Sequence, residues 1–300
     1  MNSYYYGDPD KADSWEYAAS IFAAHESVNS KKTSSLPLVQ FWKPSHSKGG
    51  LSECAENFLK ECGLTLNLRN SEFCFEYPVP ANGGKGKASM TDLMIFADSY
   101  AIAIEAKWTE CKRKYETIKE WEKTGNVENH KKVLNGWIAY INDYLKASGS
   151  NRKMKAAEAI EEIPYQLLHR VASACHAANE RNKANAIVAY HLFYDTGKSG
   201  TVSYMESNYA KNLEEWFSMM FEPSDEGKFP ITFHVILTEV KLPPNDSDVG
   251  KRFGGMKRRD YNDIFVLMQD KDVYSFVPES LRKWVNPDPH SKIDHQQASE

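Results

Sequence analysis

The sequence predicts an α/β protein in which helices flank a central β-sheet. An amphipathic stripe with helical spacing covers residues 51–62, and three runs of strand-like composition follow it. A further helical segment from Pro164 then leads into an apolar, β-branched run at 186–194. With 300 residues, the chain is long enough to bury a sizeable core without disulfides or metals, as one large domain or as two smaller ones.

Composition and charge are those of an ordinary globular protein. The chain has 37 Lys and Arg residues against 41 Asp and Glu, a formal charge of −4, which favours no whole-molecule attraction to nucleic acid but allows local basic patches. Five scattered cysteines without a CxxC pair favour a reducing compartment. No signal peptide or long apolar run is present, so we expect a cytoplasmic protein without a membrane segment.

The N-terminal part predicts one helix and a connector. Residues 12–28 place Trp15, Ala18 and Phe22 at helical spacing. The stretch after them mixes Ser, Lys, Pro and Gly and contains a short apolar anchor at 38–42. We therefore assign residues 1–47 to an N-terminal helical extension.

The next part predicts a helix and three strands. The stripe at 51–62 ends at Gly63, which suits a helix C-cap. Strand-like runs follow at Glu72–Val79, Thr91–Ala97 and Tyr100–Lys107, with a loop rich in Gly and Lys between the first two.

The rest of the chain alternates helices and strands. Residues 109–147 predict a helical region, 148–153 form a polar break, and Pro164 suits the first turn of a helix that runs to about Ala178. The remaining predicted elements are a strand at 186–194, a helix near 213–220, a strand at 231–240 and a disordered polar tail at 286–300.

Charged residues inside apolar strands mark the candidate site. If a hairpin turns at Asp98 and Ser99, Asp92 lies opposite Glu105 on one face, with Cβ atoms about 4.5–5.5 Å apart. Two like charges at that separation repel, and a divalent cation such as Mg²⁺ relieves the repulsion.

Strand alternation puts Lys107 on the same face as both carboxylates. A slip of one residue in the hairpin would send Asp92 to the other face, whereas a four-residue loop would keep the same pairing.

Asp92, followed by Glu105-Ala106-Lys107 at the end of an apolar strand, resembles the D…ExK signature of PD-(D/E)XK nucleases. The family's core order of a helix, three strands, a helix and a strand is similar to the order predicted for residues 48–195. The resemblance implies a restriction-endonuclease-like core with a mixed central sheet, a helical insertion at 109–147 and a C-terminal extension at 196–285 packed on the core. The family's PD dipeptide is absent, because Thr91 precedes Asp92.

The resemblance also implies roles for the residues of the signature. Asp92 and Glu105 would ligate Mg²⁺ or Mn²⁺ together with the backbone carbonyl of Ala106. Lys107 would orient the attacking water or help to deprotonate it. The reaction would be hydrolysis of a phosphodiester bond, in which the cation offsets the charge that develops in the transition state.

Two helical residues complete the implied site. Members often add an acid from the first helix, which Glu56 or Glu53 could supply, and we choose Glu56. The segment YQLLHR resembles a pattern with a glutamine on the helix after the lysine, here Gln166. Helical spacing puts Gln166, Arg170 and Ser173 on one polar stripe, which could face an anionic substrate or solvent.

Basic residues near the signature are candidates for binding nucleic acid, although such runs are commonly only solvated faces. The candidates are Lys85, Lys87, Lys112, Arg113, Lys114 and Arg170.

The sequence thus predicts a metal-dependent nuclease that acts on DNA, of the kind found in restriction and anti-phage defence systems. A homodimer fits the restriction role, and a complex with a helicase or ATPase fits the defence role, since the chain has no P-loop. The alternatives are a catalytically silent nucleic-acid-binding or assembly module of the same fold, an RNA-directed nuclease, or a DNA-repair nuclease.

Overall fold

The structure is a computed structural model. It describes residues 3–7, 14–24, 34–45, 50–64, 71–108, 115–195, 209–223, 229–248, 250–251, 272–278 and 282–286.

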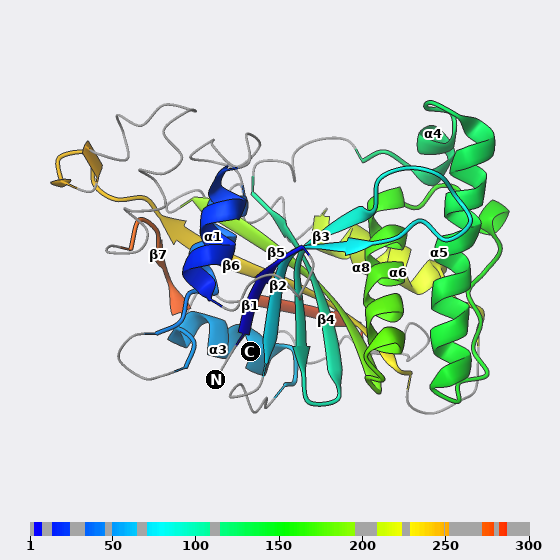
Figure 1. Ribbon diagram of the computed structural model, residues 1–300, viewed down its shortest axis with the longest axis horizontal. Coiled ribbons are helices and arrows are strands. Elements are labelled where there is room, and N and C mark those ends of the chain that lie inside the picture. Colours follow the sequence, from blue (N-terminus) through cyan, green and yellow to red (C-terminus); the bar gives the residue numbers. More distant parts are fainter. Residues whose placement is uncertain are drawn as a thin grey trace.

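A mixed sheet forms the centre of the described part of the molecule (Figure 1). Its eight strands run in the spatial order β1-β2-β3-β4-β5-β6-β7, and β8 pairs with β6. The pairs β2–β3 and β3–β4 are antiparallel, whereas β4–β5 and β5–β6 are parallel. The strands are β1 Ser3–Tyr6, β2 Glu72–Val79, β3 Ser89–Ala97, β4 Tyr100–Lys107, β5 Asn185–Asp195, β6 Ile231–Lys241, β7 Ser275–Phe276 and β8 Arg282–Asn286.

Helices cover both faces of the sheet, each over its own hydrophobic cluster. One face is covered by α1 Trp15–Ala24, α2 Ser35–Phe41 and α3 Glu53–Glu61. The other is covered by α4 Ile118–Glu122, α5 Val127–Ala147, α6 Tyr165–Glu180 and α8 Lys211–Met219, with a 3₁₀ turn at Ala157–Ala159. None of the described helices is both long and apolar enough to cross a membrane.

The α/β class predicted from the sequence is confirmed, as are the positions of the main elements. The amphipathic stripe at 51–62 forms α3, with the Ser52 hydroxyl accepting a hydrogen bond from the Ala55 N–H as its N-cap. Pro164 is the N-cap of α6 and not part of its first turn. The segment expected to be a helical insertion, residues 109–147, contains α4 and α5, and its first residues, 109–114, lie outside the described part.

Two N-terminal elements were not predicted. The stretch assigned to a connector contains α2, which tolerates Pro37 because the first-turn N–H groups of a helix have no intrahelical partner. Ser3–Tyr6 adds a parallel edge strand beside β2, and the Tyr4 ring stacks on Phe73 with centroids 4.9 Å apart.

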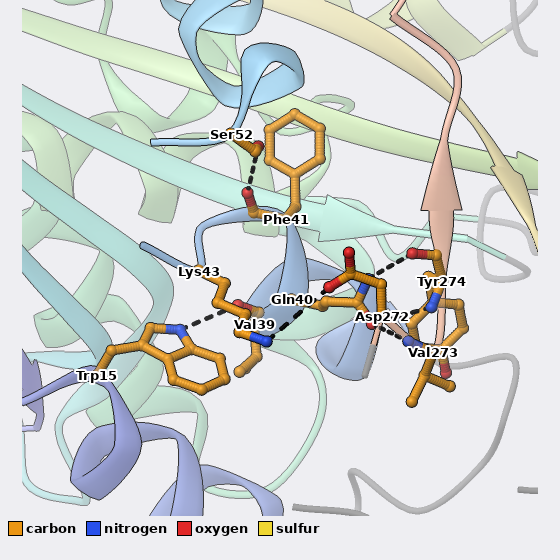
Figure 2. A network of polar contacts seen from close by, with 9 residues as sticks. All are labelled: Trp15, Val39, Gln40, Phe41, Lys43, Ser52, Asp272, Val273 and Tyr274. Atoms are coloured by element: carbon orange, nitrogen blue, oxygen red, sulfur yellow. Dashed lines mark hydrogen bonds and ion pairs between the residues drawn. The ribbon is translucent and has the colours of Figure 1, made fainter. Parts of the chain in front are cut away.

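A buried glutamine joins the N-terminal and C-terminal segments (Figure 2). The Oε1 atom of Gln40 accepts hydrogen bonds from the backbone N–H groups of Val273 and Tyr274, at 2.8 and 2.9 Å. Its Nε2 atom donates to the carbonyl oxygen of Tyr274.

Strands from the predicted extension at 196–285 belong to the same sheet as the strands of the predicted core. The predicted tail beyond 286 lies outside the described residues.

Candidate active site on the β3–β4 hairpin

The β3–β4 hairpin has the register that the sequence predicted. Ala97 pairs with Tyr100, and the ladder continues in the same register as far as Ile104. Extended by one position beyond the last pair, Leu93 with Ile104, this register puts Asp92 opposite Glu105. Burial and then the charge of Glu105 raise the pKa of Asp92. The turn residue Asp98 has a φ of 42°, in the left-handed region that Asp adopts more readily than most residues, so the tight turn needs no glycine.

Side-chain alternation directs Asp92, Glu105 and Lys107 toward the face covered by α6. The Nζ atom of Lys107 lies 2.6 Å from Oε1 of Glu105. The backbone N–H of Ala106 donates to Oδ2 of Asp92 at 2.8 Å, which links the two strands at the carboxylates. The structure therefore brings together the three signature residues predicted from the sequence.

Arg170 on α6 completes the contacts of Glu105. Its Nη2 atom forms an ion pair with Oε2 of Glu105, and its Nη1 atom donates to the Met90 carbonyl oxygen at 2.8 Å. Only 4% of Arg170 is exposed. The sequence placed this arginine on a stripe facing substrate or solvent, but it lies inside the site and pairs with a carboxylate, so we no longer assign it to a nucleic-acid-binding surface.

A third carboxylate, that of Glu76, lies at the site and was not predicted. Its neighbours in β2 pair with Leu93 and Thr91 of β3, which makes Asp92 the facing position. Glu76 itself has a φ of 50°, and the ladder is interrupted there. The signal that could have revealed it is a charge inside the apolar run FCFEYPV.

The three carboxylates differ in their electrostatic surroundings. Burial, and then the charge of Asp92, raise the pKa of Glu76 to about 7. Burial and the charge of Glu105 raise the pKa of Asp92. Burial also disfavours the charged form of Glu105, but Arg170 and Lys107 outweigh it and lower the pKa of that carboxyl. Burial likewise opposes the charged form of Lys107, yet Glu105 and Asp92 raise its pKa above the ordinary value.

Two of these carboxylates form no ion pair with any of the described residues. Among the described residues, neither Glu76 nor Asp92 forms an ion pair, whereas Glu105 turns one oxygen to Lys107 and the other to Arg170. We call Glu76, Asp92, Glu105, Lys107 and Arg170 the charged cluster.

The donors of the charged cluster fit a hard divalent cation. Such a cation takes oxygen ligands, and Mg²⁺ usually needs only one or two protein carboxylates, which Asp92 and Glu76 can supply. The described residues contain no group of three or more His, Cys, Asp or Glu side chains placed to hold a metal ion.

The other predicted site residues lie apart from these contacts. Glu56 and Glu53 are in the first turn of α3, which packs on the face of the sheet opposite to α6. The structure thus does not bring Glu56 to the cluster, where the additional carboxylate is that of Glu76. Gln166 is exposed on α6, one turn before Arg170.

The exposed Lys85 and Lys87 lie on the loop at 80–88, which is held against α5. The Lys85 N–H donates to Oδ1 of Asn129 at 2.6 Å, and Nδ2 of Asn129 donates back to the Lys85 carbonyl oxygen at 2.8 Å. A Cβ on Gly136 of α5 would collide with the carbonyl oxygen of Asn82. The other predicted basic run, Lys112 to Lys114, which includes Arg113, lies outside the described residues.

Comparison with known families gives one match. Residues 11–235, more than half of the chain, match the model of a family described as Domain of unknown function (DUF6946). All five members of the charged cluster lie within the matched region. No curated protein and no solved structure matches the chain.

Proposed function

The chain belongs to the DUF6946 family, and we propose that this domain is a metal-dependent nuclease that hydrolyses phosphodiester bonds in DNA. The observation that carries the proposal is the placement of Asp92 opposite Glu105 on a hairpin whose second strand ends in Lys107. The order α3, β2, β3, β4, α6, β5 supports a restriction-endonuclease-like core, because it is the order of PD-(D/E)XK nucleases.

The residues that would hold the cation follow from the donors. Asp92 and Glu76, which form no ion pair among the described residues, would be the main ligands of Mg²⁺ or Mn²⁺. Glu105, which is paired with Lys107 and Arg170, and the carbonyl of Ala106 are the further ligands that the family resemblance implies. When bound, the cation supplies Lewis-acid chemistry: it lowers the pKa of water and polarises a phosphoryl oxygen. The hydrogen bond from the Ala106 N–H fixes the orientation of the Asp92 carboxylate before any ligand arrives.

Lys107 acts as a cation and not as a base. Its raised pKa keeps the ammonium group charged at neutral pH, and its ion pair with Glu105 fixes its position. A charged ammonium group there orients the attacking water and stabilises negative charge on the phosphate, but it cannot accept a proton. Of the two roles expected for Lys107 from the sequence, orientation of the water is therefore the one we propose.

The loop at 80–88 gives the proposed nuclease a candidate surface for its substrate. Lys85 and Lys87 are exposed, and the contacts with Asn129 hold the backbone of the loop in place. Two lysines on a fixed loop would bind phosphates with an affinity that falls as salt rises. We propose a role in restriction or anti-phage defence in the cytoplasm, as a homodimer or with a helicase or ATPase partner, on analogy with other nucleases of this fold.

One observation favours a second candidate, a catalytically silent module of the same fold. Both oxygens of Glu105 already have cationic partners, as they would in an ion-pair network that needs no metal. In that case, the charged cluster would hold α6 on the sheet, and the protein would act by binding or assembly.

The test is cleavage by the purified full chain with Mg²⁺ or Mn²⁺. The substrates are supercoiled plasmid, linear duplex, single-stranded DNA and RNA, with a chelator and Glu105→Ala as controls. Glu72→Ala is the matched variant, since Glu72 also lies on the sheet but pairs with Arg181 at 3.5 Å. We expect DNA cleavage that is lost with the chelator and in Glu105→Ala and kept in Glu72→Ala.

Other outcomes would change the proposal in different ways. Cleavage that persists in Glu105→Ala would place the active site elsewhere. Cleavage of RNA alone would identify an RNA-directed nuclease. No cleavage, together with no effect of Mn²⁺ on the melting temperature, would favour the silent module.

A further inference from the structure

We propose that the site takes one divalent cation, and that the guanidinium group of Arg170 stands beside Glu105 in the place of a second. This inference rests on the proposed function, since it concerns the cation that a nuclease of this kind would use. The signature residues alone do not fix how many metal ions take part.

The first argument is the position of the guanidinium group. Arg170 pairs with Oε2 of Glu105 in β4 and donates to the carbonyl oxygen of Met90 in β3, two residues before Asp92. It therefore spans the two strands that carry the predicted ligands. In two-metal sites the ions lie about 3.5–4 Å apart and share carboxylate ligands. A second ion that shared Glu105 would have to displace this guanidinium group.

The second argument is that Arg170 cannot readily move away. It is 4% exposed, and its neighbours Leu168, Val171 and Ala174 on α6 are fully buried. Withdrawing the guanidinium group would remove one of the two cationic partners of Glu105, a residue that is only 3% exposed. Breaking a buried pair in this way is strongly destabilising because it leaves a buried charge uncompensated, so the arginine is a permanent part of the site.

The third argument is the charge of the cluster. With all three carboxylates ionised, as ligands of a cation would be, they and the two cationic side chains carry one net negative charge. One divalent cation would make the site singly positive, which offsets the single negative charge of a phosphodiester. Two divalent cations would leave a large excess of positive charge around buried groups, which is costly. Arg170 is thus a positioning residue that holds Glu105 and supplies a fixed positive charge.

The experiment counts the Mn²⁺ ions that bind to the metal-free full chain. Electron paramagnetic resonance measures free Mn²⁺ during a titration, and calorimetry gives an independent stoichiometry. We expect one ion per chain. Two ions per chain of comparable affinity would overturn the inference and leave the proposed nuclease function standing. No saturable binding would overturn the proposed function, and the inference with it.

Variants of Arg170 test whether it takes the place of an ion. Arg170→Met removes the charge and keeps much of the side-chain volume, so we expect a second Mn²⁺ to bind. Arg170→Lys keeps the charge and should still bind one ion. The control is Arg181→Met, because Arg181 pairs with Glu72 at 3.5 Å and not with the cluster. A folded Arg170→Met protein that binds one Mn²⁺ ion would overturn the inference. If that variant does not fold, the number of Mn²⁺ ions bound by wild type and by Arg170→Lys tests the inference.

Discussion

Glu76 of β2 lies at the register position opposite Asp92 of β3, and burial and the charge of Asp92 raise the pKa of Glu76; neither residue has an ion-pair partner among the described residues. Glu76 also has a φ of 50°, an uncommon conformation for a residue other than glycine. Such a conformation costs about 1–3 kcal/mol and tends to occur at functional sites. The fold therefore holds two partly buried carboxylates close together without an ion-pair partner among the described residues, an arrangement that a bound cation would stabilise.

The first prediction concerns Glu76→Gln. Removing one of two facing carboxylates relieves repulsion, so we expect the metal-free variant to be about 1–2 kcal/mol more stable than wild type in urea unfolding. The same change should weaken Mn²⁺ binding by about tenfold or more, since a ligand oxygen loses its charge. Glu72→Gln, on the same strand, should show neither effect. A variant that loses stability and binds Mn²⁺ normally would make Glu76 a structural residue.

The second prediction is a dependence of stability on pH. The pKa of Glu76 is about 7 in the folded protein, against an ordinary value of 4.5. Between these values the folded state binds more protons than the unfolded state, so this group lowers the free energy of unfolding as pH rises through the window. The stability difference between Glu76→Gln and wild type, both metal-free, should therefore grow by about 1–2 kcal/mol from pH 5 to pH 8.

The comparison of the two proteins is needed because other groups titrate at lower pH. Burial lowers the pKa of His191 to about 3 and that of His169 below its ordinary value, and these groups act in the opposite direction. A difference that stays constant across the window would show that the Glu76 carboxyl has an ordinary pKa.

Local patterns predicted the hairpin because its information lies within about 20 residues of chain. The alternation of side chains along the strands and the turn at Asp98 were sufficient to predict Asp92 opposite Glu105. The observed register of β3 and β4, which runs to Leu93 and Ile104, agrees with this placement. Arg170 could not be placed in the same way. A helical wheel identifies a polar stripe but does not say whether the stripe faces solvent or a buried carboxylate, which depends on how α6 packs on the sheet.

Glu76 illustrates a different limit. Its charge within an apolar strand can be read from the sequence, but which residue lies opposite it depends on the register of β2 against β3. A long loop joins these two strands, so a tight turn does not fix that register as it does for β3 and β4. The short segments β1 and α2 carry too few residues for a periodic pattern, so tertiary packing decides them.

The third prediction concerns Lys107→Met, which keeps the apolar stem and removes the ammonium group. We expect a folded protein that binds Mn²⁺ and cleaves DNA at least about 100-fold more slowly, because water is no longer oriented. Lys183→Met is the matched control, since the Nζ atom of Lys183 contacts the other end of the same hairpin, 2.6 Å from the Asp98 carbonyl oxygen. An active Lys107→Met enzyme would contradict the proposed site.

The fourth prediction concerns Gly136→Ala. The new Cβ would collide with the backbone of Asn82, so the loop at 80–88 must move away from α5. We expect a loss of about 1–3 kcal/mol in unfolding experiments and weaker binding of DNA, as the lysine-bearing loop is displaced. Asn135→Ala, an exposed neighbour on the same helix, should leave both unchanged. Unaltered stability in Gly136→Ala would show that the loop is not held by this contact.

The fifth prediction concerns the double variant Lys85→Ala, Lys87→Ala. If both lysines bind phosphates, DNA affinity should fall, and the slope of log affinity against log salt should become shallower by roughly 2. The control is Lys146→Ala with Lys153→Ala, because Lys146 lies at the opposite end of α5 from Asn129. Binding is measured by fluorescence anisotropy with Ca²⁺ in place of Mg²⁺. A slope that is the same in the double variant and in wild type would show that the DNA-binding surface lies elsewhere on the protein.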